Sequence, residues 1–292
     1  MSNSPTPPRR IAIAAHPKLP KAVVEALKIK SFLEARGITV SCCNTLDDEN
    51  LTQNLALQEN DLFIVIGGDG TMLRAGHLCA PLGLPILGIN MGRFGFLYEI
   101  QPDHWPVMLP QLLEGNFWLE KRMMLRAELW VNDQQAGGWD VINEVVVCRG
   151  HVVRPIHVSA SVDGYHMATY VADGLIAATP TGSTAYALAV GGPIMPPELR
   201  NILVIPIAPH LSVDRAVILP EGACVTITAN TDHEAVFSID GHPAEPIAEG
   251  GVVKVSASSL SVSFTRFHDR GFFYRNLMRY MENNPSAGVN YE

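Results

Sequence analysis

Apolar strands alternate with helical segments over residues 11–90, and this alternation limits the possible folds more than any other feature of the sequence. Residues 11–15, 61–66 and 84–90 are short apolar runs, as expected of strands that are covered on both faces. Residues 21–37 place small and aliphatic side chains at the spacing of one helix face, and these are Ala22, Ala26, Ile29 and Leu33. A series of strands and helices predicts parallel βαβ units with right-handed crossovers.

Further signals in the same region complete this prediction. Residues 38–43 have the composition of another strand, and Gly37 stands where the preceding helix would end. Residues 71–80 follow a glycine turn and can form a second helix. We interpret residues 93–100 as an apolar strand that joins two domains. The sequence therefore predicts an N-terminal Rossmann-like α/β domain with a parallel sheet over residues 10–100.

The sequence changes character near residue 100. From there on the apolar runs are short, rich in Val, Ile and Thr, and separated by Gly, Pro, Asp and Asn, which is typical of a β-rich domain. The runs lie at residues 124–132, 141–149, 156–164, 175–179, 201–208, 216–220, 224–230, 235–240, 252–258 and 260–267. We therefore predict a disordered tail at residues 1–9, a C-terminal β-rich, β-sandwich-like domain over residues 101–265, and a C-terminal segment over residues 266–292 that contains a closing helix at 275–283.

Composition and charge exclude several classes of protein. The chain has 292 residues and a formal net charge of -8, an acidic balance that argues against a nucleic-acid partner. No apolar run approaches the ~18 to 20 residues that cross a bilayer, and the polar start MSNSPTPPRR lacks the apolar h-region of a signal peptide. The 5 scattered cysteines have no CxxC spacing, which argues for a reducing compartment. We expect a cytoplasmic protein that binds neither membranes nor nucleic acid.

The motif Gly67-Gly68-Asp69-Gly70-Thr71 follows the apolar run at 61–66 directly. Glycines allow positive φ and remove Cβ, so that main-chain amides can line a concave surface, and the following helix would direct its positive end to the same place. Such a surface at the carboxyl end of a parallel strand can bind phosphate. The alternative is an ordinary tight turn that is capped by Asp69 or Thr71.

Several familiar nucleotide-binding and catalytic motifs are absent. The sequence has no GxxxxGK[ST] loop, and Leu73 replaces the third glycine of a GxGxxG fingerprint. Ser183 does not lie in a GxSxG elbow, because residue 181 is Thr, and no HExxH motif occurs. P-loop hydrolases, Rossmann dehydrogenases, α/β-hydrolases and zincin-type metalloproteases are therefore excluded on these motifs.

Two further stretches carry candidate binding residues. Asn143 and Glu144 begin a buried strand, where a carboxylate suits a ribose diol and an amide suits a base edge; the alternative is a plain polar strand entry. Residues 172–194 combine Asp173 with a hydroxyl-rich turn and a small-residue helix whose N-terminus would be lined with donors. The hydroxyl residues are Thr179, Thr181, Ser183, Thr184 and Tyr186. A capped turn is again the alternative, but it explains only one or two of them.

Arginines and histidines give weaker signals. Arg74, Arg93 and Arg154 are candidate phosphate partners, although a solvated surface arginine is the default interpretation of each one. His210 and His242 are candidates for ligand contact, with packing or turn roles as the alternative.

The order of these motifs resembles the ATP- or polyphosphate-dependent NAD kinases. The sequence reads GGDGTM, GINMGRFGFL, NEVVV, DGLIAATPTGSTAYALAVGGPI and PIAPHLS in turn, and the resemblance covers about residues 10–270. The stretch TPTGSTAY is the more specific part, because lipid kinases share GGDGT. The resemblance implies transfer of the γ-phosphate of ATP, with polyphosphate as a possible donor, to the 2′-hydroxyl of the adenosine ribose of NAD, which gives NADP.

The resemblance also implies roles for particular residues. Asp69 matches the proton acceptor, Gly68 and Gly70 lie beside it in the pocket, and Asn143 and Glu144 match the pair that holds the adenosine part of NAD. Further nucleotide-binding positions are Arg74, Arg154, Asp173, Thr184, Ala185, Tyr186, Ala187, Leu188, Ala189 and Ala208. A divalent metal, Mg²⁺, would arrive mainly on the phosphate donor, and no dedicated metal site is expected. The family implies homodimers or homotetramers, and a C-terminal segment that returns to the N-terminal domain.

The chain departs from the family pattern at two positions. His242 follows Asp240-Gly241 where Gln is common, and Val171 replaces a basic residue that some members carry two places before Asp173. The replacement at Val171 is expected to affect whether the protein prefers NAD or NADH. Two other functions compete with this one: a lipid kinase that uses the same GGDGT turn, and a nucleotide sensor that binds without catalysis.

Overall fold

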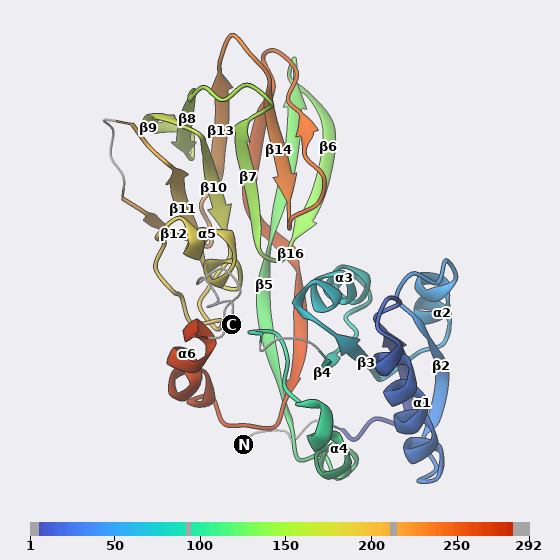
Figure 1. Cartoon of the computed structure of the whole chain (residues 1–292). Helices are drawn as coiled ribbons and strands as arrows, with labels where there is room; N and C mark the ends of the chain where they lie inside the picture. Colours follow the sequence, from blue (N-terminus) through green and yellow to red (C-terminus); the bar gives the residue numbers. More distant parts are fainter. Residues whose placement is uncertain (1–5, 92–94, 211–214, 283–292) are drawn as a thin grey trace. The chain divides into compact units, whose positions relative to one another are not determined.

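The computed structural model describes residues 6–91, 95–210 and 215–282, and Figure 1 traces their helices and strands. The chain divides into two compact units. The first comprises Met1–Lys121 and Val262–Glu292, and the second comprises Arg122–Ser261. This division assigns residues 101–121 to the first unit, whereas the sequence analysis begins the second domain at residue 101.

Parallel strands form the sheet of the first unit, in the order β2, β1, β3, β4 and the last part of β16. Their bounds are β1 (Arg10–Ala15), β2 (Thr39–Thr45), β3 (Leu62–Gly67), β4 (Ile86–Asn90) and β16 (Val252–Arg266). Strand β1 pairs in parallel with β2 and β3, and β3 pairs in parallel with β4. Phe264 of β16 pairs in parallel with Ile86 of β4. The predicted α/β class with a parallel N-terminal sheet is confirmed.

Helices connect and flank these strands. They are α1 (Pro20–Glu34), α2 (Leu51–Leu57), α3 (Asp69–Cys79), α4 (Trp105–Leu113) and α6 (Phe272–Glu282), with short 3-10 turns η1 (Ala80–Leu82) and η2 (Pro102–His104). Helix α1 buries the four predicted side chains, which are Ala22, Ala26, Ile29 and Leu33. It ends at Glu34, and Gly37 follows with a left-handed φ of 79° that glycine adopts at little cost. None of the helices in the described part of the chain combines the length and the apolar composition that a membrane span requires.

The predicted strand at residues 93–100 is wrong. Residues 93 and 94 lie outside the described residues, and residues 95–99 follow an irregular path, with Ile100 forming only an isolated bridge to Ile89. The physical reason is that main-chain amides of this segment bond to a side chain and not to a neighbouring strand. The amides of Phe96 and Leu97 point to a carboxylate on α3 instead of a neighbouring strand.

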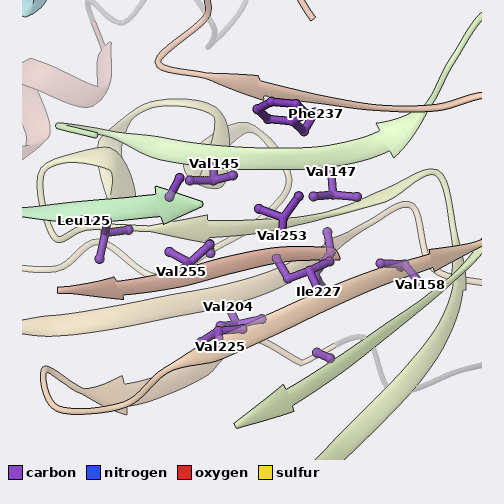
Figure 2. Close-up of a cluster of buried hydrophobic side chains, with 14 of the residues drawn as sticks. Leu125, Val145, Val147, Val158, Val204, Val225, Ile227, Phe237, Val253 and Val255 are labelled. Atoms are coloured by element: carbon purple, nitrogen blue, oxygen red, sulfur yellow. The ribbon is translucent and has the colours of Figure 1, made fainter. Parts of the chain in front are cut away.

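Antiparallel strands build the second unit. One set pairs as β16, β13, β8 and β9, with β5 paired to β6, and the other set pairs in the order β12, β11, β10, β7, β14 and β15. The bounds are β5 (Trp118–Val131), β6 (Gln134–Val141), β7 (Glu144–Arg149), β8 (Ile156–Val162), β9 (Tyr165–Ala172), β10 (Gly174–Ala178), β11 (Asn201–Ile207), β12 (Val217–Pro220), β13 (Val225–Asn230), β14 (Ala235–Ile239) and β15 (Glu245–Pro246). Buried side chains from both sets form one core, part of which Figure 2 draws. The predicted β-sandwich-like character is confirmed.

Three details of the β-rich unit differ from the sequence analysis. The predicted runs at 252–258 and 260–267 form one continuous strand, β16. Strands β6 and β9 were absent from the prediction, because their residues are largely polar or partly exposed and show no apolar alternation. Each lies at the end of a pairing order, so that one edge makes no ladder with a described strand.

A substitution in α1 tests the packing of the first unit. Leu33 is fully buried, so Leu33→Ala should lower the free energy of unfolding by about 2–5 kcal/mol. Leu27 lies on the opposite side of the same helix and is 54% exposed, so Leu27→Ala should change it by less than about 0.5 kcal/mol. Urea unfolding followed by far-UV circular dichroism measures both values. Equal losses would contradict the assigned helix face.

Candidate active site

The turn between β3 and α3 brings the glycine motif to the carboxyl end of a central parallel strand. Strand β3 ends at Gly67, and α3 begins at Asp69, two residues earlier than predicted. Gly68 is the N-cap residue, and its amide donates to the Thr71 hydroxyl over 3.1 Å. Neither Asp69 nor Thr71 is therefore the N-cap, and Asp69 occupies the first turn, where a carboxylate is favoured by the helix dipole.

The glycines act through the absence of a side chain. None of Gly67, Gly68 and Gly70 has a positive φ, so this loop does not use the left-handed conformations that glycine allows. A Cβ on Gly67 would lie 2.4 Å from Thr71 Oγ1, whereas a Cβ on Gly68 or Gly70 would meet nothing within 4 Å. Packing therefore requires Gly67. Gly68 and Gly70 instead leave the main chain open to close approach by another molecule.

The carboxylate of Asp69 is half-buried and rests on the irregular segment after β4. Its Oδ2 accepts a hydrogen bond from the Phe96 amide over 3.2 Å, and its Oδ1 accepts one from the Leu97 amide over 3.4 Å. A Cβ on Gly95 would lie only 2.3 Å from Oδ1, so a side chain at this position would displace the carboxylate. The main chain of residues 95–97 thus sets the orientation of the Asp69 carboxylate.

The predicted arginines are placed differently. Arg74 lies on α3 and is exposed, and Arg154 is exposed in the connection between β7 and β8. Arg93 lies outside the described residues. The structure thus leaves the two described arginines on the surfaces of their own units.

In the second unit, Asp240 organises the start of β7. Its carboxylate accepts hydrogen bonds from three successive amides: Ile142 over 2.8 Å, Asn143 over 2.7 Å and Glu144 over 3.0 Å. Asp240 has a φ of 49°, which aspartate tolerates better than most residues. Sequence reasoning gave Asp240 no role. The Asp-Gly pair after β14 was the available signal.

Glu144 is the most unusual ionisable group of this unit. It is 6% exposed, and its Oε2 atom has no hydrogen-bond partner within the described structure. Burial raises the pKa of Glu144 to about 8, the nearby charge of Asp240 adds to this, and a hydrogen bond from the Tyr186 amide opposes it. At neutral pH the side chain is therefore largely a neutral acid that can donate a proton to a ligand hydroxyl or carbonyl.

The hydroxyl-rich turn after β10 is mostly bonded to itself. Thr179 Oγ1 donates to the Ile142 carbonyl and accepts from the Gly182 amide, at 2.6 Å and 3.0 Å. Ser183 Oγ donates to the Pro180 carbonyl and accepts from the Met195 amide, and Thr184 Oγ1 donates to the Thr181 carbonyl. These hydroxyls shape the turn, because Thr179, Ser183 and Thr184 each donate to a main-chain carbonyl. Thr181 Oγ1 is buried with no hydrogen-bond partner within the described structure.

The small-residue helix predicted after this turn is short. It comprises only α5 (Tyr186–Ala189), preceded by the 3-10 turn η3 (Gly182–Thr184). The predicted donor-lined helix N-terminus is therefore not formed. A Cβ on Gly182 would lie 2.1 Å from the Asn143 carbonyl oxygen, so the turn packs directly on the main chain of Asn143.

The turn also brings Asp173 and Tyr186 near one another. Arg149 Nε donates to Asp173 Oδ1 over 2.9 Å, and burial raises the pKa of Tyr186, with the charges of Cys148 and Asp173 adding to it. Tyr186 remains 43% exposed. Arg149 is a site residue that sequence reasoning missed. It lies at the end of β7, the strand that Glu144 begins.

Ala208 follows β11 and is exposed. Its φ of 46° is left-handed, which costs an alanine on the order of 1 kcal/mol. Within the described residues, no three His, Cys, Asp or Glu side chains come together as metal ligands would. The first unit thus carries Asp69, an oriented carboxylate next to glycines. The second unit carries Glu144, a buried acid, together with Tyr186 and the Arg149–Asp173 ion pair.

Comparison with known proteins gives consistent matches along the chain. A family model for the ATP-NAD kinase N-terminal domain matches residues 11–117, and one for the ATP-NAD kinase C-terminal domain matches residues 142–267. The NAD kinase of Dehalococcoides mccartyi strain BAV1 is 36% identical over 280 residues, which are 96% of this chain and 98% of that protein. The NAD kinase of Chloroflexus aggregans is 36% identical over 269 residues, or 92% and 97% of the two chains.

Solved structures agree with these matches. The NAD kinase of Archaeoglobus fulgidus in complex with ATP superposes with a TM-score of 0.73 at 26% identity, covering 94% of this chain and 99% of that one. Yeast NADH kinase in complex with NADH has a TM-score of 0.85 at 21% identity, covering 98% and 91% of the two chains. The second likeness concerns the fold alone.

The protonation of Glu144 can be tested through stability. The folded chain keeps this proton up to about pH 8, whereas the unfolded chain releases it near 4.5, so rising pH through this window favours unfolding. Glu144→Gln cannot titrate, and its stability relative to the unmodified protein should therefore increase between pH 5 and pH 8, by up to a few kcal/mol. Urea unfolding at pH 5, 6.5 and 8 measures this difference. A flat profile for Glu144→Gln would contradict the assigned protonation.

Proposed function

Because the chain belongs to the ATP-NAD kinase family, we infer that it phosphorylates NAD with ATP as the phosphate donor. We propose that the acceptor is the 2′-hydroxyl of the adenosine ribose, so that the product is NADP. The observation that carries this proposal is the Asp69 carboxylate, which main-chain amides orient beside glycines that leave room for a ligand.

The proposed reaction needs one proton acceptor. Asp69 accepts the proton of the ribose hydroxyl while the hydroxyl oxygen forms its bond to the γ-phosphorus. The bond from that phosphorus to the β–γ bridging oxygen breaks, and ADP leaves. A positioned base of this kind typically contributes about 10²–10⁴-fold in rate. Positioning and charge neutralisation supply the rest, because phosphoryl transfer asks little covalent chemistry of the protein.

The donor phosphates are proposed to lie over Gly68 and Gly70. A Cβ would meet nothing at either position, so phosphate oxygens can approach the amides at the start of α3. Arg74, on α3, is the proposed basic partner of these phosphates, and Arg154, in the second unit, is proposed as a further nucleotide-binding residue. Mg²⁺ enters as part of the ATP complex, since it prefers phosphate oxygens and water to an all-protein cage.

The dinucleotide is proposed to bind the second unit through Asn143 and Glu144. A buried acid oxygen without a partner is costly unless a ligand satisfies it, and a ribose or base group can do so. Asp173, Ala208 and the run Thr184, Ala185, Tyr186, Ala187, Leu188 and Ala189 are the further proposed contacts. For Thr184 the contact is proposed through the main chain or methyl group, because its hydroxyl donates to the Thr181 carbonyl.

A cytoplasmic location and a homodimer or homotetramer complete the proposal. The 5 cysteines are all free in the structure, which fits a reducing compartment. A lipid kinase and a non-catalytic sensor are the competing functions. Incubation with ATP, Mg²⁺ and NAD, followed by a coupled NADP-dependent dehydrogenase, detects an NAD kinase. A parallel reaction with diacylglycerol in place of NAD, followed by the release of ADP, detects a lipid kinase, and a sensor gives neither product.

Asp69→Asn tests the proposed base. The amide side chain keeps the shape of the carboxylate but cannot accept the proton, so kcat should fall by about 10²–10⁴-fold while KM for NAD changes little. The coupled assay gives both constants, and a thermal melt checks that the variant is folded. Full turnover by the folded variant would remove Asp69 from the mechanism.

Gly68→Ala tests the proposed donor surface. Gly68 has a φ of -112° that alanine also adopts, and the methyl group would meet no protein atom within 4 Å, so the variant should fold normally. The methyl group would occupy space assigned to phosphate, so KM for ATP should rise about tenfold or more, a change worth about 1.4 kcal/mol. Gly67→Ala is the matched control, because its methyl group would clash with Thr71 and should lower the melting temperature instead. An unchanged KM for ATP in Gly68→Ala would rule out this placement of the phosphates.

A further inference from the structure

Arg266, at the end of β16, lies buried next to the segment that orients Asp69. Its side chain is 9% exposed, and Nη1 donates to the Leu97 carbonyl over 3.2 Å. The amide of the same residue, Leu97, donates to Asp69 Oδ1. One residue thus links the guanidinium to the proposed base by two hydrogen bonds.

Two buried glutamates hold this guanidinium in place. Nε donates to Glu120 Oε2 over 2.9 Å, Nη2 lies 2.8 Å from the same oxygen, and Nη1 donates to Glu99 Oε2 over 3.3 Å. The Glu99 and Glu120 side chains are 3% and 7% exposed. A fork of five N–H donors suits this arrangement, because it can serve two carboxylates and a carbonyl from one plane.

Glu99 is itself fixed from the other side. Its Oε1 accepts the amides of Phe267 and His268 over 2.8 Å and 3.1 Å, and His268 Nδ1 lies 2.8 Å away. Burial opposes the ionisation of Glu99, but the His268 side chain, Arg266 and the two amides outweigh it and keep the pKa of Glu99 below its ordinary value. The carboxylate therefore stays charged and holds Arg266 at neutral pH.

Leu97 needs such an anchor. It is buried, and residues 95–97 lie outside any strand or helix, so they take part in no strand ladder with the described residues. Further along the segment, the amides of Glu99 and Ile100 donate to the Gly88 carbonyl. A small rotation of the Leu97 peptide would turn its amide away from the Asp69 carboxylate.

We propose that Arg266 is a positioning residue for Asp69, which it serves by holding the Leu97 carbonyl so that the Phe96 and Leu97 amides keep the carboxylate in its reactive orientation. This assignment rests on the proposed role of Asp69 as the base. Arg266 lies 169 positions from Leu97 in the sequence, and it would act on the reaction only through the orientation of Asp69.

Arg266→Lys tests the assignment. Lysine keeps the positive charge between Glu99 and Glu120, but its single nitrogen cannot serve both carboxylates and the Leu97 carbonyl together. We expect kcat to fall about 10- to 100-fold, because misplacement of a catalytic group by about 1 Å can cost that much, while KM for NAD and for ATP stays within about threefold. Arg275→Lys, in an exposed ion pair on α6 of the same unit, is the matched control and should keep full activity.

A double-mutant cycle separates positioning from general damage. If Arg266 acts through Asp69, Arg266→Lys should lower the residual turnover of Asp69→Asn by less than about twofold, whereas independent effects would multiply. Leu33→Ala, which destabilises the same unit elsewhere, is the comparison. Its effect on turnover, whether a loss or none, should be the same in the unmodified protein and in Asp69→Asn. If Arg266→Lys does not fold, Glu120→Gln keeps an acceptor for Nε, loosens the same guanidinium and enters the same cycle with an expected 3- to 10-fold loss.

The outcomes are distinct for the two proposals. Full kcat in folded Arg266→Lys, or an effect that multiplies with that of Asp69→Asn, would overturn the positioning role while leaving the proposed function intact. Absence of NADP from the unmodified protein would instead refute the proposed function, and full turnover by Asp69→Asn would refute the base and Arg266 with it.

Discussion

Hydrogen bonding of aspartate carboxylates to main-chain amides, in irregular segments and at the start of a strand, is the interaction on which the candidate site residues of each unit depend. Asp69 is held by the amides of Phe96 and Leu97, and Asp240 is held by those of Ile142, Asn143 and Glu144. Buried amides outside a ladder must find an acceptor, and a carboxylate offers several lone-pair positions. Each aspartate thereby stabilises an irregular segment and is itself oriented by it.

The two aspartates differ in their surroundings and in what their carboxylates affect. Asp69 remains half-buried at a surface that glycines leave bare, which suits a group that must meet a substrate. Asp240 brings a negative charge beside Glu144 and so helps to keep that acid protonated, second to the effect of burial itself.

Local sequence patterns were enough to predict most helices and strands. The hydrogen bonds and the protonation state that were not predicted depend on contacts between residues far apart in the sequence. The spacing of Ala22, Ala26, Ile29 and Leu33 gave the buried face of α1, because a helix repeats over a few residues. Strands β6 and β9 had no such repeat, since little of either is buried. The hydroxyls near Thr181 were correctly placed in a turn, but their bonding to carbonyls such as Ile142, 37 positions away from Thr179, is invisible in composition. The proton on Glu144 and the role of Arg266 depend on partners about 100 or more positions distant.

Two residues of the second unit that are not glycine have strained main-chain angles. Asp240 and Ala208 both adopt left-handed φ angles without being glycine, at 49° and 46°. The strain at Asp240 is offset, because its carboxylate gains three amide donors by adopting that turn. Ala208 has no side-chain polar group to gain such bonds, yet it directly follows Ile207, whose carbonyl accepts the Asp173 amide. Strain of about 1 kcal/mol persists only where the surrounding structure imposes it. Here the Asp173 amide bonds to the Ile207 carbonyl at the end of β11, directly before the strained alanine, and the Asp173 carboxylate in turn accepts a hydrogen bond from Arg149.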